Sequence, residues 1–164
     1  MRLDLRDIIN IPGASIAFDY EPDLSETAFG SVKGVKQARA VGSIRNGAGV
    51  LLFSAEVDAV LECTCARCVK DFDNPVHLKI EATLSDGEQD EDDPDKFFLQ
   101  GDIVDVDEII TTDFVLNMDQ RIFCREDCQG LCEKCGADLN EGPCACKLEI
   151  DPRLAVLGQF LEND

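Results

Sequence analysis

The chain has 164 residues, 45% of them hydrophobic, which is enough for one sizeable core, and no stretch approaches the roughly 20 consecutive apolar residues of a membrane span. Its first residues, M-R-L-D-L-R, lack the apolar core of a secretory signal, so we expect a cytoplasmic protein without a membrane partner. The 34 acidic and 15 basic residues give a net charge of −19, and because the basic residues are scattered, this charge argues against direct non-specific binding to nucleic acid.

The N-terminal third reads as β-structure broken by turns. Residues 1–6 alternate apolar and polar side chains, which predicts a half-buried strand. Prolines and glycines interrupt residues 10–30, and residues 32–44 are compatible with a strand. Asn46 and Gly47 tolerate positive φ angles, so the run R-N-G-A-G predicts a hairpin turn.

Two further strands are expected on either side of the motif C-A-R-C. In residues 50–63 the apolar face carries Val57, Ala59, Leu61 and Cys63. In residues 76–84 the alternation is cleaner, and the apolar face carries Val76, Leu78, Ile80, Ala82 and Leu84. The motif therefore occupies the turn between two antiparallel strands, where a turn can aim both sulfurs at one ion.

The rest of the chain predicts a loop and two helices. Residues 85–95 carry seven acids, but no glycine and no closing glutamate fall at the positions that a calcium loop requires, so we expect a solvated loop. Asp105 and Glu108 have the spacing of a capping box. The helix that they begin has a core-facing stripe of Val106, Ile110, Phe114 and Met118. An Asp-Pro pair at 151–152 predicts a second, short helix at the C-terminus.

These elements predict an α+β fold. Its body, residues 1–120, is an antiparallel β-sheet with one covering helix and the acidic loop 85–95. Residues 121–148 form a cysteine-rich zinc-knuckle segment, and residues 149–164 form the short C-terminal helix.

The nine cysteines are the feature of the sequence that indicates a specific chemistry most strongly. A reducing cytoplasm keeps thiols unpaired, so clustered cysteines there favour a metal over disulfides. The odd number also leaves at least one thiol outside a complete disulfide framework. We therefore expect one or two structural Zn²⁺ ions, with free structural thiols as the remaining alternative.

The first predicted metal site consists of Cys132, Cys135, Cys144 and Cys146. Two intervening residues let Cys132 and Cys135 bind one ion, and Gly136 permits the tight turn of a zinc knuckle. A Gly-Pro turn precedes the C-A-C pair. Together these residues form a Cys₄ set within a short segment.

A second candidate site involves the cysteines that precede the knuckle. Cys124, Cys128 and Cys132 recur at four-residue spacing, as a helical stripe of buried thiols would, but Gly130 makes a continuous helix poor. Grouping Cys124 and Cys128 with the C-A-R-C pair is the better account.

In that second site, Cys65 and Cys68 would join Cys124 and Cys128, so that the metal staples the strand turn to the segment after the helix. Cys63 is then left as a buried free thiol on the apolar face of its strand.

Such metal sites would be structural, because four thiolates leave no coordination position for water or substrate. The single histidine, His77, excludes every two-histidine catalytic zinc motif, and we expect it at the surface. No nucleotide-binding or nucleophile-elbow motif is present, so we expect neither catalytic residues nor a small-molecule substrate.

Three motifs of the chain strongly resemble the YceD family. They are the C-A-R-C pair between strands, the run D-C-Q-G-L-C-E-K-C-G-A-D-L-N-E-G-P-C-A-C and the closing D-P-R-L-A-V-L. Members of this family are named large ribosomal RNA subunit accumulation proteins. The resemblance implies a role in the synthesis, processing or stability of large-subunit (23S) ribosomal RNA in bacteria, and it transfers no catalytic residue. Some members lack the knuckle but keep the C-x-x-C, with His and Cys near the places of Cys124 and Cys128, which supports the grouping of the second site.

The leading hypothesis is therefore a non-enzymatic factor in ribosome biogenesis. Its acidic surface would hold a basic ribosomal protein or a large-subunit assembly intermediate rather than RNA. Two alternatives stay open: a thiol-redox enzyme that uses the C-A-R-C pair, and a zinc-module adaptor unrelated to ribosomes. An iron–sulfur cluster is a variant of the metal hypothesis, since Cys₄ sets also hold iron.

Overall fold

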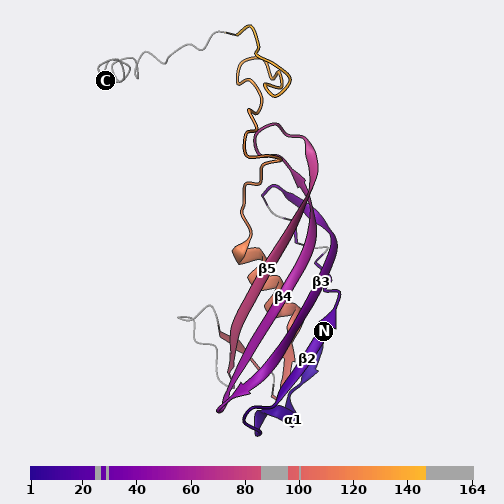
Figure 1. The fold of residues 1–164 in the computed structure, drawn as a ribbon, viewed down its shortest axis with the longest axis vertical. Coiled ribbons are helices and arrows are strands. Elements are labelled where there is room, and N and C mark those ends of the chain that lie inside the picture. Colours follow the sequence, from indigo (N-terminus) through magenta and orange to yellow (C-terminus); the bar gives the residue numbers. More distant parts are fainter. Residues whose placement is uncertain (25–26, 29, 86–95, 100, 147–164) are drawn as a thin grey trace, which may run out of the picture.

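The computed structural model describes residues 1–24, 27–28, 30–85, 96–99 and 101–146. Three long strands form the body, and the cysteine-bearing loops extend from one end of them (Figure 1). In chain order the described elements are β1 (Arg2–Asp4), α1 (Arg6–Ile9), β2 (Ser15–Tyr20), β3 (Val32–Gly47), β4 (Val50–Thr64), β5 (Asp71–Ser85), β6 (Lys96–Phe98), β7 (Ile103–Asp105) and α2 (Val106–Asn117).

The main sheet has five strands in the order β2-β3-β4-β5-β6, and β1 pairs with β7 in a separate ribbon. The prediction of a wholly antiparallel sheet is wrong, because β6 runs parallel to β5, with Thr83 opposite Lys96. The fold is α+β with a mixed sheet.

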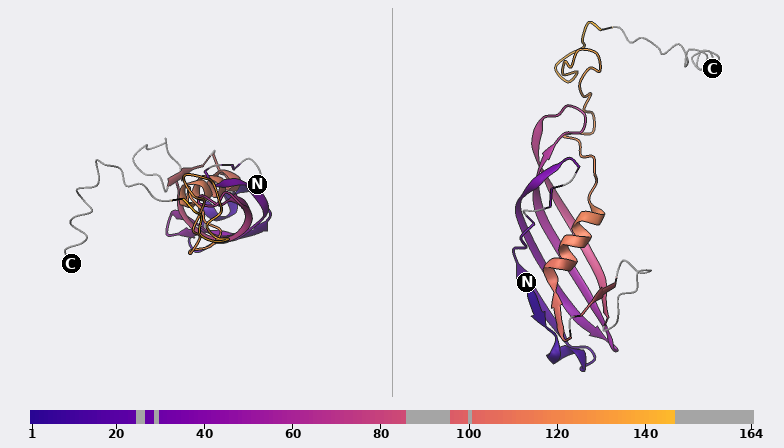
Figure 2. Two further views of the ribbon diagram at one scale, coloured as in Figure 1. Left: turned by 90° about the horizontal axis from the view of Figure 1, so that it is seen from above. Right: turned by 180° about the vertical axis from the view of Figure 1, so that it is seen from behind.

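The alternation predicted for β4 and β5 is confirmed. Along β4 every second side chain is buried, from Leu51 to Cys63, while Glu56 and Asp58 face outward. On that outward face Glu56 pairs with Lys79 across the strands. The buried face is covered by α2, which lies along the long strands in Figure 2.

Helix α2 is the covering helix that the sequence predicts. It begins at the N-cap Asp105, whose Oδ1 accepts a hydrogen bond from the backbone N–H of Asp107 at 3.2 Å. Tyr20 of β2 donates its hydroxyl to Asp107 Oδ1 at 2.8 Å, which ties the helix to the sheet. Three members of the predicted stripe, Val106, Ile110 and Phe114, are confirmed as buried core, and Ile109 is buried beside them. The fourth member, Met118, is the C-cap after the helix and packs against the core only partly buried.

The hairpin between β3 and β4 is confirmed, but its turn lies two residues later than the Asn-Gly signal indicates. Gly47 pairs with Val50, so the turn residues are Ala48 and Gly49, with φ angles of 58° and 98°. Asn46 is instead only 1% exposed. Its Nδ2 donates to the carbonyl oxygens of Ile8 at 2.8 Å and Ile9 at 2.6 Å, and its Oδ1 accepts from the N–H of Gly49 at 2.8 Å.

Asn46 therefore joins the hairpin to α1, and its replacement is expected to destabilise the fold. Asn46→Ala removes three hydrogen bonds of a buried side chain to the backbone and should lower the free energy of unfolding by about 2 kcal/mol, measured by urea denaturation. Asn10→Ala, at an exposed asparagine after α1, is the matched control and should change stability by less than about 0.5 kcal/mol. Equal losses at the two positions would contradict this role.

Some sequence predictions concern residues outside the described ranges. The acidic loop 85–95 lies there except for Ser85, and so does the helix expected in residues 149–164. The division at residues 120 and 148 stays a prediction. Within the described part, no helix is long and apolar enough to cross a bilayer.

Candidate metal centres

Eight cysteines form two groups of four at the end of the long strands. We call Cys65, Cys68, Cys124 and Cys128 the sheet-end cluster, and Cys132, Cys135, Cys144 and Cys146 the knuckle cluster. Within each cluster the Sγ atoms all lie within 4.8 Å of one another. The structure thus brings together the same residues that the sequence groups as its two candidate sites, while metal ligation itself stays a prediction.

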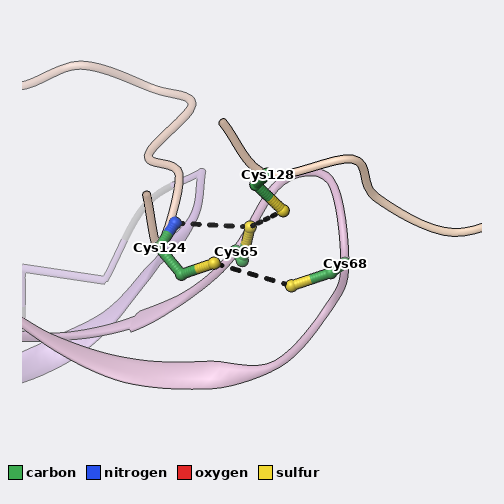
Figure 3. A group of neighbouring side chains, drawn as sticks. All are labelled: Cys65, Cys68, Cys124 and Cys128. Atoms are coloured by element: carbon green, nitrogen blue, oxygen red, sulfur yellow. Dashed lines mark hydrogen bonds between the residues drawn. The ribbon is translucent and has the colours of Figure 1, made fainter. Parts of the chain in front are cut away.

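The turn between β4 and β5 supplies half of the sheet-end cluster. Thr64 and Asp71 form the last strand pair, and inside it the Cys65 N–H donates to the Lys70 carbonyl at 2.9 Å. Val69 adopts a φ of 59°, and its N–H donates to the Cys65 carbonyl at 3.0 Å. This tight turn holds Cys65 and Cys68 with both sulfurs facing Cys124 and Cys128 (Figure 3).

The segment after α2 supplies the other half because backbone hydrogen bonds attach it to that turn. The Ala66 N–H, in the turn, donates to the Ile122 carbonyl at 2.9 Å, and the Ser31 N–H, just before β3, donates to the Gln120 carbonyl at 3.1 Å. The Cys124 N–H then points at Cys65 Sγ at 3.4 Å. Cys124 is therefore placed against the turn by the main chain.

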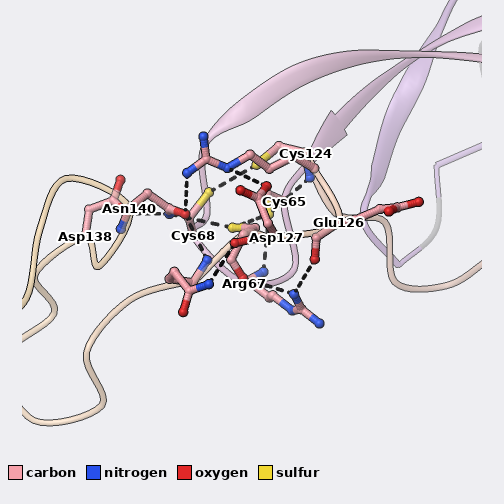
Figure 4. A network of polar contacts seen from close by, with 11 residues as sticks. Cys65, Arg67, Cys68, Cys124, Glu126, Asp127, Asp138 and Asn140 are labelled. Atoms are coloured by element: carbon pink, nitrogen blue, oxygen red, sulfur yellow. Dashed lines mark hydrogen bonds and ion pairs between the residues drawn. The ribbon is translucent and has the colours of Figure 1, made fainter.

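Arg67, between the two turn cysteines, holds the stretch around Cys128. Its Nη1 donates to the carbonyl oxygens of Glu126 at 3.1 Å and Cys128 at 3.0 Å (Figure 4). Its guanidinium also lies over the ring of Phe123, 4.3 Å from the centroid, in a cation–π contact. These contacts hold the backbone around Cys128 in place, and Cys128 itself is only 2% exposed.

The sulfur separations fit a tetrahedral metal and not a disulfide. Cys65 Sγ lies 3.8 Å from Cys128 Sγ, and Cys68 Sγ lies 3.7 Å from Cys124 Sγ. Four sulfurs at the zinc–thiolate bond length of about 2.3 Å define a tetrahedron with edges of about 3.8 Å. A disulfide would need about 2.05 Å, and all nine cysteines, which the structure describes, are free thiols.

The electrostatics of the sheet-end cluster favour one thiolate. Burial raises the pKa of Cys65, but the backbone N–H groups of Cys68, Cys124 and Arg67 point at its sulfur and bring the pKa down to about 6. Burial and then the neighbouring sulfurs raise the pKa of Cys124 to about 12. A divalent cation would offset the repulsion among the sulfurs and let all four ionise.

The knuckle cluster is built around a tight turn. The Gly136 N–H donates to the Cys132 carbonyl at 2.8 Å, and Gly136 has a φ of 72°, as the C-x-x-C-G motif predicts. The N–H groups of Cys135 and Lys134 lower the pKa of Cys132 to about 6. The sulfur of Cys135, followed by burial, raises the pKa of Cys146 to about 12. The same balance of one favoured thiolate and crowded partners recurs here.

A family model described as "Large ribosomal RNA subunit accumulation protein YceD" matches residues 53–161, more than half of the chain and both clusters. The chain belongs to the YceD family. Membership implies a role in the accumulation of large-subunit ribosomal RNA, and the YceD resemblance seen in the sequence is confirmed. No curated protein and no solved structure matched the chain.

Two other residues considered in the sequence lie outside the clusters. Cys63 is 0% exposed and packs in the sheet core. The His77 side chain is 48% exposed on the outward face of β5, with Nδ1 2.8 Å from Asp58 Oδ1. Sequence reasoning placed Arg67 beside the C-A-R-C thiols as a charge that could lower a thiol pKa, whereas in the structure it donates to the carbonyl oxygens of Glu126 and Cys128. It missed Asn140 as a neighbour of the sulfurs, although Asn140 follows the knuckle glycine in a D-L-N stretch typical of a turn.

The thiol-redox alternative has one favourable feature, the lowered pKa of Cys65. However, Cys65 is 1% and Cys68 4% exposed, so a disulfide substrate has no line of approach to either sulfur. The arrangement suits a closed structural site better than a redox centre.

Proposed function

We propose that this protein is a non-enzymatic factor that supports the synthesis, processing or stability of 23S ribosomal RNA by holding a basic ribosomal protein or a large-subunit assembly intermediate. The observation that carries the proposal is YceD membership over residues 53–161. In this proposal, each cysteine cluster holds one structural Zn²⁺, and the metals shape the end of the molecule that follows the sheet.

The donor sets support a structural role for the metals. When bound, zinc would supply a closed tetrathiolate centre that cross-links distant chain segments. In the sheet-end cluster those segments are the β4–β5 turn and the stretch after α2. A catalytic site would instead leave one coordination position for water or substrate.

The distribution of charge supports a basic partner. Many of the described basic side chains already pair with acids, among them Lys33 with Asp71, Lys36 with Asp73 and Arg39 with Asp19. Positive charge is thus already matched by acids within the molecule, and the surplus of acids behind the net charge of −19 favours a positively charged partner. An acidic surface attracts a basic protein and repels the phosphates of RNA.

The proposal is tested by depleting the protein from its host and measuring the ratio of large- to small-subunit ribosomal RNA. We expect the ratio to fall, and to recover when the protein is supplied again. An unchanged ratio would overturn the proposal.

Affinity capture after nuclease treatment separates the proposed partner from the alternatives. A basic large-subunit ribosomal protein should remain bound without RNA and be released by added salt, because ionic strength screens the attraction between exposed charges. Recovery of non-ribosomal proteins alone would favour the adaptor alternative.

A further inference from the structure

The knuckle segment touches the other cluster through one side chain. Asn140 lies in the loop between Cys135 and Cys144, yet its Nδ2 points at Cys128 Sγ at 3.6 Å. Its Oδ1 accepts hydrogen bonds from the Gln129 N–H at 2.8 Å and from Arg125 Nη2 at 2.8 Å. Asn140 therefore contacts a sulfur of the sheet-end cluster and the backbone beside it.

Asp138 holds Asn140 in that position. Its Oδ1 accepts from the Asn140 N–H at 2.9 Å and from Asn140 Nδ2 at 2.6 Å. Both N–H bonds of the Asn140 amide are thus used, one by Asp138 and one by the Cys128 sulfur. The second carboxylate oxygen, Oδ2, pairs with Lys70 Nζ at 2.6 Å, and Lys70 closes the turn that carries Cys65 and Cys68.

The main chain reinforces this connection. The Leu131 N–H donates to the Arg67 carbonyl at 3.2 Å, and the Leu139 N–H donates to the Gly130 carbonyl at 2.9 Å. Gly130 has a φ of 73°, and a Cβ there would lie 3.0 Å from the Arg67 carbonyl oxygen. These bonds fold the loop back onto the β4–β5 turn (Figure 4).

We propose that the two clusters bind metal cooperatively, with Asn140 as the positioning residue that connects them. Metal at the knuckle cluster would order the loop between Cys135 and Cys144 and so present the Asn140 amide to Cys128. A residue that hydrogen-bonds a metal ligand without touching the metal holds that ligand in position. Its loss typically lowers metal affinity by about 10- to 100-fold. Because coupling between two sites is reciprocal, metal at the sheet-end cluster favours the knuckle cluster equally.

The test is a titration of the metal-free full chain with Co²⁺, followed through the visible absorption of tetrathiolate cobalt. Removing the knuckle cluster with Cys132→Ser and Cys135→Ser should weaken Co²⁺ binding at the sheet-end cluster by about 10-fold or more. Asn140→Asp keeps the oxygen that accepts from Gln129 but replaces the donor with a carboxylate oxygen. It should weaken the same site similarly in the otherwise intact chain.

Two further variants test whether Asn140 connects the two clusters. Added to the chain that lacks the knuckle cluster, Asn140→Asp should have little further effect, because both changes break the same connection. Asn117→Ala removes an exposed asparagine whose amide bonds only within α2, and it should leave both affinities unchanged. Circular dichroism checks that the sheet is retained in each variant.

This inference rests on the metal sites of the proposed function, and the titration separates the two failures. If the chain binds two Co²⁺ ions and neither affinity changes when Asn140 or the other cluster is altered, the cooperativity is overturned but the metal sites are retained. A chain that takes up no tetrathiolate cobalt would overturn both.

Discussion

Replacing Cys65 and Cys128 together by serine is expected to reduce the zinc content of the purified protein from two ions to one per chain and to lower its melting temperature. A ligand present at about 1,000 times its dissociation constant stabilises the folded state by about 4 kcal/mol, and this contribution disappears with the site. Both residues are nearly fully buried, so the double substitution also opens the contact between the β4–β5 turn and the segment after α2. Elemental analysis and thermal melting measure the two effects.

Two other substitutions serve as controls for this result. Cys63→Ala removes a buried thiol that belongs to neither cluster and should leave two ions bound. Cys135→Ser with Cys146→Ser should remove one ion with a smaller loss of stability, because both residues are exposed and lie beyond the end of the sheet. If the Cys65 and Cys128 variant kept its zinc content and melting temperature, the metal hypothesis for the sheet-end cluster would fail.

Truncating Phe114 in α2 is expected to have the other large effect. Phe114 is 0% exposed where the helix covers the sheet, and Phe114→Ala removes a whole ring from a closed core. Such truncations cost about 3–5 kcal/mol of unfolding free energy. Urea denaturation followed by circular dichroism measures the loss.

Leu116→Ala, two positions further along the same helix, is the matched control. Leu116 is 66% exposed, so its truncation should change stability by less than about 0.5 kcal/mol. Comparable losses at both positions would contradict the burial of one face of α2 against the sheet.

The parts of the fold that sequence reasoning predicted are those where burial repeats along one element. The period-two alternation of β4 and β5 identifies their core face, and the stripe that contains Phe114 identifies the core face of α2. Burial of a whole face imposes such a pattern on many successive residues, so a single sequence suffices to detect it.

The elements that were missed depend on contacts distant in sequence. Strand β6 has three residues and exists through its pairing with the end of β5, and β2 lies in a stretch dominated by turn residues. The hairpin turn was displaced because Asn46 is used by α1, a contact across 37 or 38 residues that local turn preferences do not contain.

The candidate site shows the same division. The two-residue spacing of Cys132 and Cys135 and the position of Cys65 and Cys68 in a turn are features of short sequence segments. The sequence therefore predicted that each of these two pairs would bind one ion. The grouping of Cys65 with Cys128 drew further support from the YceD resemblance. The contact of Asn140 with Cys128 arises only when the knuckle loop folds back onto the β4–β5 turn, so the spacing of residues in the sequence does not predict it.

The length of the sheet has a consequence for how the molecule comes apart. The β4–β5 ladder runs from Leu51 opposite Leu84 to Thr64 opposite Asp71, and amides in the middle of such a ladder exchange with solvent only when the whole sheet opens. The cysteine-bearing turn is at the ladder's end, where fraying is easy. Bound zinc would hold that end closed. A host short of zinc would then carry molecules with an intact sheet and an open tip, which proteases would attack first.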